Sequence, residues 1–308
     1  MSLREVSRKV DFVGGWRKWF AVSLAVILLG IAAIGFGRLN LGIDFTGGSE
    51  FTVSDPGGGV SADEVEAALP QEVQNDATAQ RLGNGDFEIT TPPLEQEQST
   101  QVREALSQEF DSEVSATTVS PTFGGQLRDQ ALTAVGVALA VIVVFISYRF
   151  EFGFAMASIA ALVHDILVTV GVYALVGREV NLVTVVAVLT VLGYSLYDTV
   201  IIFDRIRENT PEDEDYERSR FDRLINDSIR QVLTRSVFTS LSTLIPLTAL
   251  LIFGGATLSD FAFALMVGII AGTYSSIFIA SPVLSLYKRW RGNRPARDRE
   301  PKPEGGQV

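Results

Sequence analysis

The 308-residue sequence contains no cysteine and only one histidine, His164. Without cysteine, the chain forms neither disulfides nor cysteine-ligated metal sites. A site built from several histidines of this chain is excluded as well, because it needs more than one imidazole. We find no other spacing typical of metal ligands, so the sequence predicts neither a metal nor another cofactor.

Basic residues are fewer than acidic ones. The sequence has 25 Lys and Arg against 36 Asp and Glu, which gives a formal net charge of −11. A nucleic-acid partner would require a basic face, so we expect no such partner. We also find no nucleophile triad and no phosphate-binding loop, so nothing indicates an enzyme that makes or breaks covalent bonds.

Long apolar segments are abundant in this sequence, in which 47% of residues are hydrophobic. Each is close to or above the roughly 17–25 residues that span a bilayer as a helix. The first is longer than the roughly 7–15 apolar residues of a signal peptide, and Trp16 and Trp19 suit an interfacial anchor. We therefore predict an α-helical membrane protein with six transmembrane helices, from residues 19–36, 131–148, 154–176, 182–203, 237–253 and 261–286.

The loop charges predict how the chain lies in the membrane. Lys and Arg concentrate near the N-terminus, between the fourth and fifth apolar segments, and in the C-terminal tail. By the positive-inside rule, these regions and both termini face the cytoplasm. The expected parts are a cytoplasmic N-terminus at 1–18, a first transmembrane helix at 19–39, an extracytoplasmic domain at 40–126, transmembrane helices 2–6 at 127–286 with a cytoplasmic loop at 204–236, and a disordered basic tail at 287–308.

The large loop has the pattern of a small α+β domain. Ser61 and Glu64 form a capping-box pattern that predicts a helix to about residue 69. Apolar residues at helical spacing predict a second helix at 100–110, and alternation predicts strands at 50–54, 78–82, 87–91 and 113–119. The order β-α-β-β-α-β indicates a ferredoxin-like domain between the first and second transmembrane helices.

Both expected joints between this domain and the membrane helices are rich in glycine. Paired glycines allow backbone conformations that other residues avoid. The joints are either tight turns or hinges that let the domain swing, and composition favours the turns. The residues concerned are Asp44, Phe45, Thr46, Gly47 and Gly48 at the first joint, and Gly124 and Gly125 at the second.

Asp198 is an acidic residue within the fourth apolar segment. An ionised Asp at the centre of a membrane helix costs roughly 2.5–3.5 kcal/mol, so such residues usually serve a function. Helical spacing places Ser195 and Thr199 near it as a polar stripe, and Arg235, at the start of the fifth segment, is a candidate partner. The alternatives are an Asp that reaches the membrane surface or caps locally, and an Arg that anchors at the interface.

Asp165 and His164 lie near the centre of the third apolar segment. A histidine and a carboxylate can relay protons, but hydrogen-bonded polar pairs also lock helix packing. For Asp165 the two interpretations stay open. For His164 we expect packing, because neighbouring residues point to different sides of a helix.

Several motifs in succession carry a family resemblance. They are Asp44-Phe45-Thr46-Gly47-Gly48, Val163-His164-Asp165, Gly193-Tyr194-Ser195-Leu196-Tyr197-Asp198-Thr199 running on to Asn209, and Thr234-Arg235-Ser236. Over nearly its whole length, the sequence resembles the SecF family of the bacterial Sec protein-export machinery. It departs at Tyr197, where many relatives have Asn, and this change alters the hydrogen bonding beside Asp198.

The resemblance implies a function and partners. It implies a subunit of the bacterial inner membrane that pairs with SecD, here as a separate chain, and associates with the SecYEG channel. The pair would use the proton-motive force to promote late steps of polypeptide translocation, with the SecA motor as an indirect partner. It also implies that Asp198 and Arg235 belong to the proton path, to which we add Asp165, Ser195 and Thr199. The alternatives are a small-molecule proton antiporter of the related resistance-nodulation-division superfamily and a passive scaffold.

Overall fold

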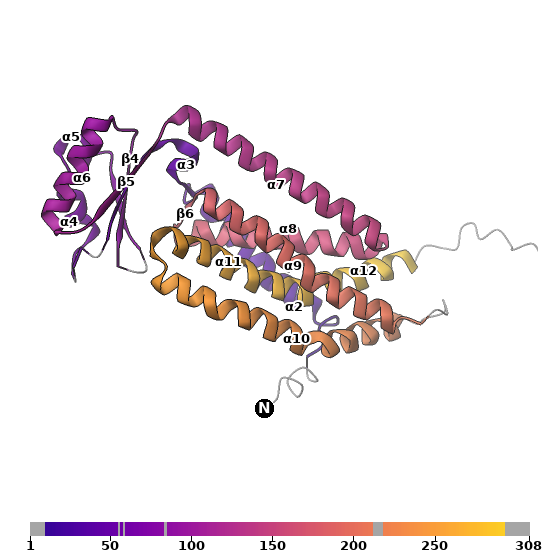
Figure 1. Ribbon diagram of the computed structural model, residues 1–308. Coiled ribbons are helices and arrows are strands. Elements are labelled where there is room, and N and C mark those ends of the chain that lie inside the picture. The colour runs from indigo at the N-terminus through magenta and orange to yellow at the C-terminus, as the bar shows by residue number, and fades with distance from the viewer. Residues whose placement is uncertain (1–9, 55, 58, 83–84, 212–217, 293–308) are drawn as a thin grey trace, which may run out of the picture.

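The structure is a computed structural model that describes residues 10–54, 56–57, 59–82, 85–211 and 218–292. Within this part of the chain, six helical segments are long and apolar enough to cross a membrane, as predicted. They lie side by side in one bundle, and a small α+β domain stands at one end of it (Figure 1). The helices are α2 (Trp16–Gly35), α7 (Pro121–Arg149), α8 (Phe152–Val176), α9 (Leu182–Asn209), α10 (Arg218–Phe253), and α11 (Gly255–Ser275), which continues through the π-helix η1 (Ser276–Ala280) into α12 (Ser281–Gly292).

The helix ends nearest the domain are set by local capping. Gly177 ends α8 with a φ of 79°, a left-handed conformation that favours glycine. Asn181 then caps α9 in a capping box with Thr184. Between these helices, β6 (Glu179–Val180) pairs in parallel with β1 (Asn40–Leu41). This two-residue pairing ties the α8–α9 connection to the segment that enters the domain.

The domain has the predicted β-α-β-β-α-β order. Its elements are β2 (Gly48–Val53), α4 (Ala62–Ala67), β3 (Thr78–Arg81), β4 (Phe87–Thr91), α6 (Gln96–Phe110) and β5 (Val114–Val119), with a short additional helix α5 (Gln71–Gln74). The antiparallel sheet has the order β3-β4-β2-β5, as in a ferredoxin-like fold. The prediction of fold class is confirmed.

One face of this sheet is apolar and the other is polar. Phe51 and Ile89, paired across β2 and β4, are fully buried in a core that includes Val65 of α4 and Leu106 of α6. Because side chains alternate along a strand, the residues between them point to the opposite face. That face carries Glu50, Thr52, Glu88 and Thr90 of the same strand pair.

The first glycine joint is a tight, packed turn. Asp44, Phe45 and Thr46 lie in the short helix α3 (Ile43–Thr46), and Gly47 follows with a φ of 75° and ψ of 157°. A Cβ on Gly47 would lie 2.6 Å from the Cα of Pro121, so both conformation and space require glycine there. The structure therefore has the turn that composition favoured, and hinge motion stays a prediction.

The second joint differs from its prediction. Gly124 and Gly125 do not lie in a loop, because α7 already begins at Pro121, with Ser120 as its cap. Proline suits the first turn of a helix, where its missing N–H is not needed, so the helix begins ten residues before the apolar segment at 131. Gly124 packs against the first joint, since a Cβ there would lie 2.9 Å from the backbone N of Gly47.

Other predicted boundaries shift in the same way. The first transmembrane helix covers Trp16–Gly35 rather than 19–39. Most of the predicted loop at 204–236 is helical, because α9 continues to Asn209 and α10 begins at Arg218. Residues 287–292 of the tail belong to α12, and the prediction of disorder for 293–308 lies outside the described residues. The ends of these helices contain charged residues, so a prediction based on apolar segments alone makes the helices too short.

Candidate functional site

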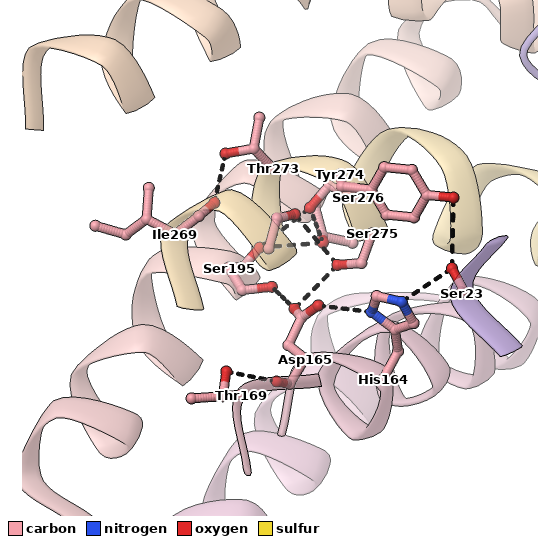
Figure 2. Close-up of polar contacts among 12 residues, drawn as sticks. Ser23, His164, Asp165, Thr169, Ser195, Ile269, Thr273, Tyr274, Ser275 and Ser276 are labelled. Atoms are coloured by element: carbon pink, nitrogen blue, oxygen red, sulfur yellow. Dashed lines mark hydrogen bonds and ion pairs between the residues drawn. The ribbon is translucent and has the colours of Figure 1, made fainter. Parts of the chain in front are cut away.

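Two of the buried carboxylates of the bundle form the candidate site, and the first of them is Asp165 of α8; a third, Asp260 of α11, pairs with Arg178. The side chain of Asp165 is 0% exposed. Ser195 of α9 and Ser275 of α11 donate hydrogen bonds to Oδ2 at 2.5 and 2.9 Å, and Nδ1 of His164 lies 3.0 Å from Oδ1. Figure 2 shows Asp165 at the centre of these three side chains. Both of its oxygens are therefore engaged, as a buried carboxylate requires.

His164 extends this network to α2. Its Nε2 lies 3.1 Å from the hydroxyl of Ser23, which lies 3.4 Å from the hydroxyl of Tyr274 (Figure 2). The expectation that His164 points away from Asp165 is wrong. The two neighbouring side chains bend toward each other and share a hydrogen bond, so α2, α8, α9 and α11 meet at one polar centre.

Close helix packing makes this centre possible. A Cβ on Gly272 of α11 would lie 2.8 Å from the Cβ of Ser195, and a Cβ on Gly30 of α2 would lie 2.5 Å from the Cα of Gly171. Contacts this close are available only to glycine, and small residues of this kind let membrane helices approach. The hydroxyls of Ser195 and Ser275 reach Asp165 because α9 and α11 are in contact here.

Asp198 is the second carboxylate of the site, with 7% of its surface exposed. Ser236 of α10 donates a short hydrogen bond to its Oδ1. Its Oδ2 is buried and has no hydrogen-bond partner among the described residues. A buried polar atom without a partner costs roughly 1–3 kcal/mol, and more when it is charged. Asp198 is thus only half satisfied, whereas Asp165 is fully bonded.

Arg235 does not form the direct pair with Asp198 that its position suggested. Within the described part of the chain, no ion pair of 4.0 Å or less joins the two. Arg235 is exposed, and its Nη2 donates a hydrogen bond to the Tyr197 hydroxyl at 3.0 Å. Arg235 still lies close enough to Asp198 to interact electrostatically.

The predicted polar stripe on α9 divides among three neighbouring elements. Ser195 faces Asp165, and Thr199 forms a hydrogen bond of 2.8 Å with Ser276 of η1. Asp198 instead faces Ser236 on α10. At ~3.6 residues per turn, Asp198 and Thr199 point about 100° apart, so adjacent polar residues of one helix reach two different helices.

Sequence reasoning missed several residues of these centres. Ser236 follows Arg235 directly within the motif Thr234-Arg235-Ser236, in which the charge of Arg235 is the more obvious feature. Ser276 lies in a π-helical turn, a feature that often occurs at functional sites. The other missed residues are Ser23, Tyr274 and Ser275. Each missed residue carries a hydroxyl group within an apolar helix, and this is the sequence feature that could have indicated it.

Comparison with known families agrees with the positions of these residues. A family model described as protein export membrane protein SecD/SecF, C-terminal, matches residues 99–290, which include both carboxylates of the candidate site. A second model, the SecD/SecF GG motif, matches residues 32–54 around the first glycine joint. The chain belongs to the SecD/SecF family of protein export membrane proteins. The resemblance seen in the sequence is confirmed.

Individual SecD/SecF relatives cover most of the chain. The protein translocase subunit SecF of Streptomyces coelicolor is 36% identical over 90% of this chain and 76% of that protein. The SecF subunit of Desulfurispirillum indicum is 39% identical over 87% of this chain and 89% of that protein. These relatives are named as subunits of a protein translocase, and none of the names describes an enzyme of covalent chemistry.

A solved structure of the family has the same fold. The crystal structure of SecDF, a translocon-associated membrane protein from Thermus thermophilus, is 35% identical, with a TM-score of 0.83 over 94% of this chain. The chain spans 40% of the length of that SecDF chain. The similarity confirms the multi-pass helical fold, and a fused SecDF relative supports SecD as the partner of SecF-type chains.

Proposed function

We propose that this protein is the SecF-type subunit of a Sec export complex driven by the proton gradient, with Asp198 as the group that binds the proton. The observation that carries the proposal is the half-satisfied carboxylate of Asp198, buried at the contact between α9 and α10 of an export-family protein. A carboxylate with an unpartnered oxygen gains more from taking up a proton than one whose oxygens are all bonded. For this reason Asp198 is the better candidate, and Asp165, with Ser195, holds the helices in place.

Protonation of Asp198 would change what its neighbours bind. The neutral form no longer attracts Arg235 and binds Ser236 differently, so the contact between α9 and α10 shifts. The membrane potential supplies about 2.3 kcal/mol per charge and 100 mV, enough to bias such a two-state contact.

The structure offers a route from this contact to the ferredoxin-like domain. The backbone N–H of Leu182, the first residue of α9, donates a hydrogen bond to Oδ2 of Asp44 at 2.9 Å. Asp44 lies in α3, which leads through the Gly47 turn into the domain. A movement of α9 along its axis would therefore reach the domain through a direct bond.

The partners and the orientation follow from the family and the loop charges. In this proposal SecD completes the complex, which associates with SecYEG and acts on the translocating polypeptide after the SecA motor. The basic ends lie in the cytoplasm of a bacterium, the chain spans its inner membrane, and the ferredoxin-like domain lies outside. The proton gradient is the energy source for this subunit in the proposal, which includes no cofactor.

The test is proton-gradient-driven export by membranes that contain the chain with its SecD partner. Asp198→Asn should abolish the gradient-dependent part of export and leave the gradient-independent part unchanged. Asp129→Asn is the matched control, because it removes an exposed carboxylate from α7. Unchanged gradient-dependent export in Asp198→Asn would refute the proposal.

The same preparations separate the two alternatives. A small-molecule antiporter would show proton flux that depends on a substrate and requires no Sec component. A passive scaffold would lose stability on mutation of Asp198 and retain gradient-driven export.

A further inference from the structure

Three glutamates meet where the ferredoxin-like domain joins the bundle. Glu50 of β2 and Glu88 of β4 lie on the polar face of the sheet, and Glu179 belongs to β6 at the end of the bundle. One carboxylate oxygen from each lies within 4.8 Å of the other two. Figure 1 shows β6 at the end of the bundle that faces the sheet. The cluster therefore contains carboxylates from both the ferredoxin-like domain and the membrane bundle.

Glu88 is buried in this cluster without a partner. It is 8% exposed, and within the described part of the chain its carboxylate accepts no hydrogen bond and forms no ion pair. Its carboxylate oxygens are not fully buried, but a charged group on a side chain covered to this extent is normally paired. Of the other two carboxylates, Glu179 accepts a hydrogen bond from Thr90 at 3.3 Å. Glu88 points at two further carboxylates and therefore lacks a positive partner.

The charged groups around the cluster do not supply that positive partner. Arg178 precedes Glu179 in the chain, but it forms a 2.6 Å ion pair with Asp260 and lies over the ring of Phe263. Asp44 and Asp260 add negative charge nearby. Burial, followed by the neighbouring carboxylates, raises the pKa of Glu88 to about 8 and that of Glu50 to about 7. Arg178 lowers the pKa of Glu88, but this is the smallest of the effects on that group.

The geometry matches the coordination of a hard cation. Calcium takes carboxylate oxygens at about 2.3–2.6 Å, so two oxygens on the same ion are at most about 5 Å apart. The three glutamate oxygens fall within that limit. Magnesium needs shorter bonds of about 2.0–2.1 Å and near-ideal octahedral geometry, so its oxygens lie at most about 4.2 Å apart. Separations of up to 4.8 Å suit calcium without rearrangement.

We propose that Glu50, Glu88 and Glu179 form a binding site for a divalent cation of calcium size, which fastens the ferredoxin-like domain to the membrane bundle. Two of the ligands come from the sheet and one from the α8–α9 connection, so the bound ion links both. The sequence contained no sign of this site, because its ligands lie far apart along the chain and on three different strands.

The experiment measures binding of calcium and of magnesium to the full chain in nanodiscs, by equilibrium dialysis. We expect one calcium ion per chain with a dissociation constant of about 10⁻⁴–10⁻³ M, the range of extracellular calcium modules. Glu88→Gln should weaken binding at least about tenfold, since affinity depends on the number of charged ligands. Glu72→Gln, in the exposed part of α5, is the matched control and should bind as the original chain does.

A second readout follows the joint itself. Calcium should slow hydrogen exchange in β2, β4 and β6 of the original chain and of Glu72→Gln, and leave Glu88→Gln unchanged. If Glu88→Gln does not fold, Glu50→Gln replaces it, because Glu50 is only partly buried. The proposal is overturned if the chain binds no calcium at about 10 mM, roughly ten times the weakest expected dissociation constant. It is also overturned if Glu88→Gln and Glu50→Gln bind calcium as tightly as the original chain does. Neither measurement involves export, so the result is independent of the proposed function.

Discussion

The guanidinium of Arg235 donates a hydrogen bond to the hydroxyl of Tyr197. Within the described part of the chain, it forms no ion pair with Asp198, the residue that follows Tyr197. Tyr197 is 53% exposed, so this bond lies on the outside of α9, whereas Asp198 is buried on the α10 side. Tyr197 thus holds the cation close to the carboxylate without letting the two meet. Tyr197 is therefore the residue that binds the guanidinium of Arg235.

Tyr197→Phe should release Arg235 toward Asp198. The substitution removes one hydrogen bond, worth about 0.5–1.5 kcal/mol, so we expect gradient-driven export to change by about two- to tenfold. Tyr148→Phe is the control, because that hydroxyl belongs to a tyrosine that is 93% exposed. Equal export rates for the two variants would show that the Tyr197 hydroxyl does not position Arg235.

Ser236→Ala should act through Asp198. It removes the one hydrogen bond that the buried carboxylate accepts, so the rate of gradient-driven export should fall. Ser242→Ala is the matched control on α10, since Ser242 is exposed and bonds to the backbone of its own helix.

A double-mutant cycle checks this link. Residues in contact show coupling energies of about 0.5–3 kcal/mol, so the effects of Ser236→Ala and Asp198→Asn on the free energy of unfolding should not add. Additive effects of the two substitutions would contradict the contact.

Gly272→Ala should separate α9 from α11. The new Cβ would lie 2.8 Å from the Cβ of Ser195, and overpacking of this kind costs about 1–3 kcal/mol. Gly193→Ala is the control, because a Cβ there meets nothing within 4 Å and alanine is about 1 kcal/mol better than glycine in a helix. Thermal unfolding in detergent should show a lower midpoint for Gly272→Ala alone. A similar midpoint for both variants would mean that the close crossing is not required.

Gly47→Ala should destabilise the first glycine joint, where α3 leads into the domain. Its φ of 75° and ψ of 157° lie in a region that is used almost only by glycine, and strain of this kind costs about 1–3 kcal/mol. Gly125→Ala offers the comparison within the second glycine pair, since its Cβ would meet nothing within 4 Å. Limited proteolysis should cut the Gly47→Ala joint faster and leave Gly125→Ala as resistant as the original chain. Faster cleavage of both would instead favour flexible hinges at both glycine pairs.

The sequence by itself determined the parts of this protein that depend on local patterns. Apolar segments of sufficient length predicted all six membrane helices, because a bilayer sets the length and composition of what crosses it. Alternation and the Ser61 capping box predicted the order of the ferredoxin-like domain. The buried position of Asp198 was also predictable, since a single acid stands out among apolar neighbours.

Only the tertiary structure decided which side chains meet. Ser236 rather than Arg235 binds Asp198, and Ser195 turns to Asp165 on another helix. These contacts depend on how each helix is rotated and how closely glycines such as Gly272 let it approach, and neither quantity is local in sequence. The same reason hid the three glutamates at the joint, because strand register and the placement of the α8–α9 connection bring them together.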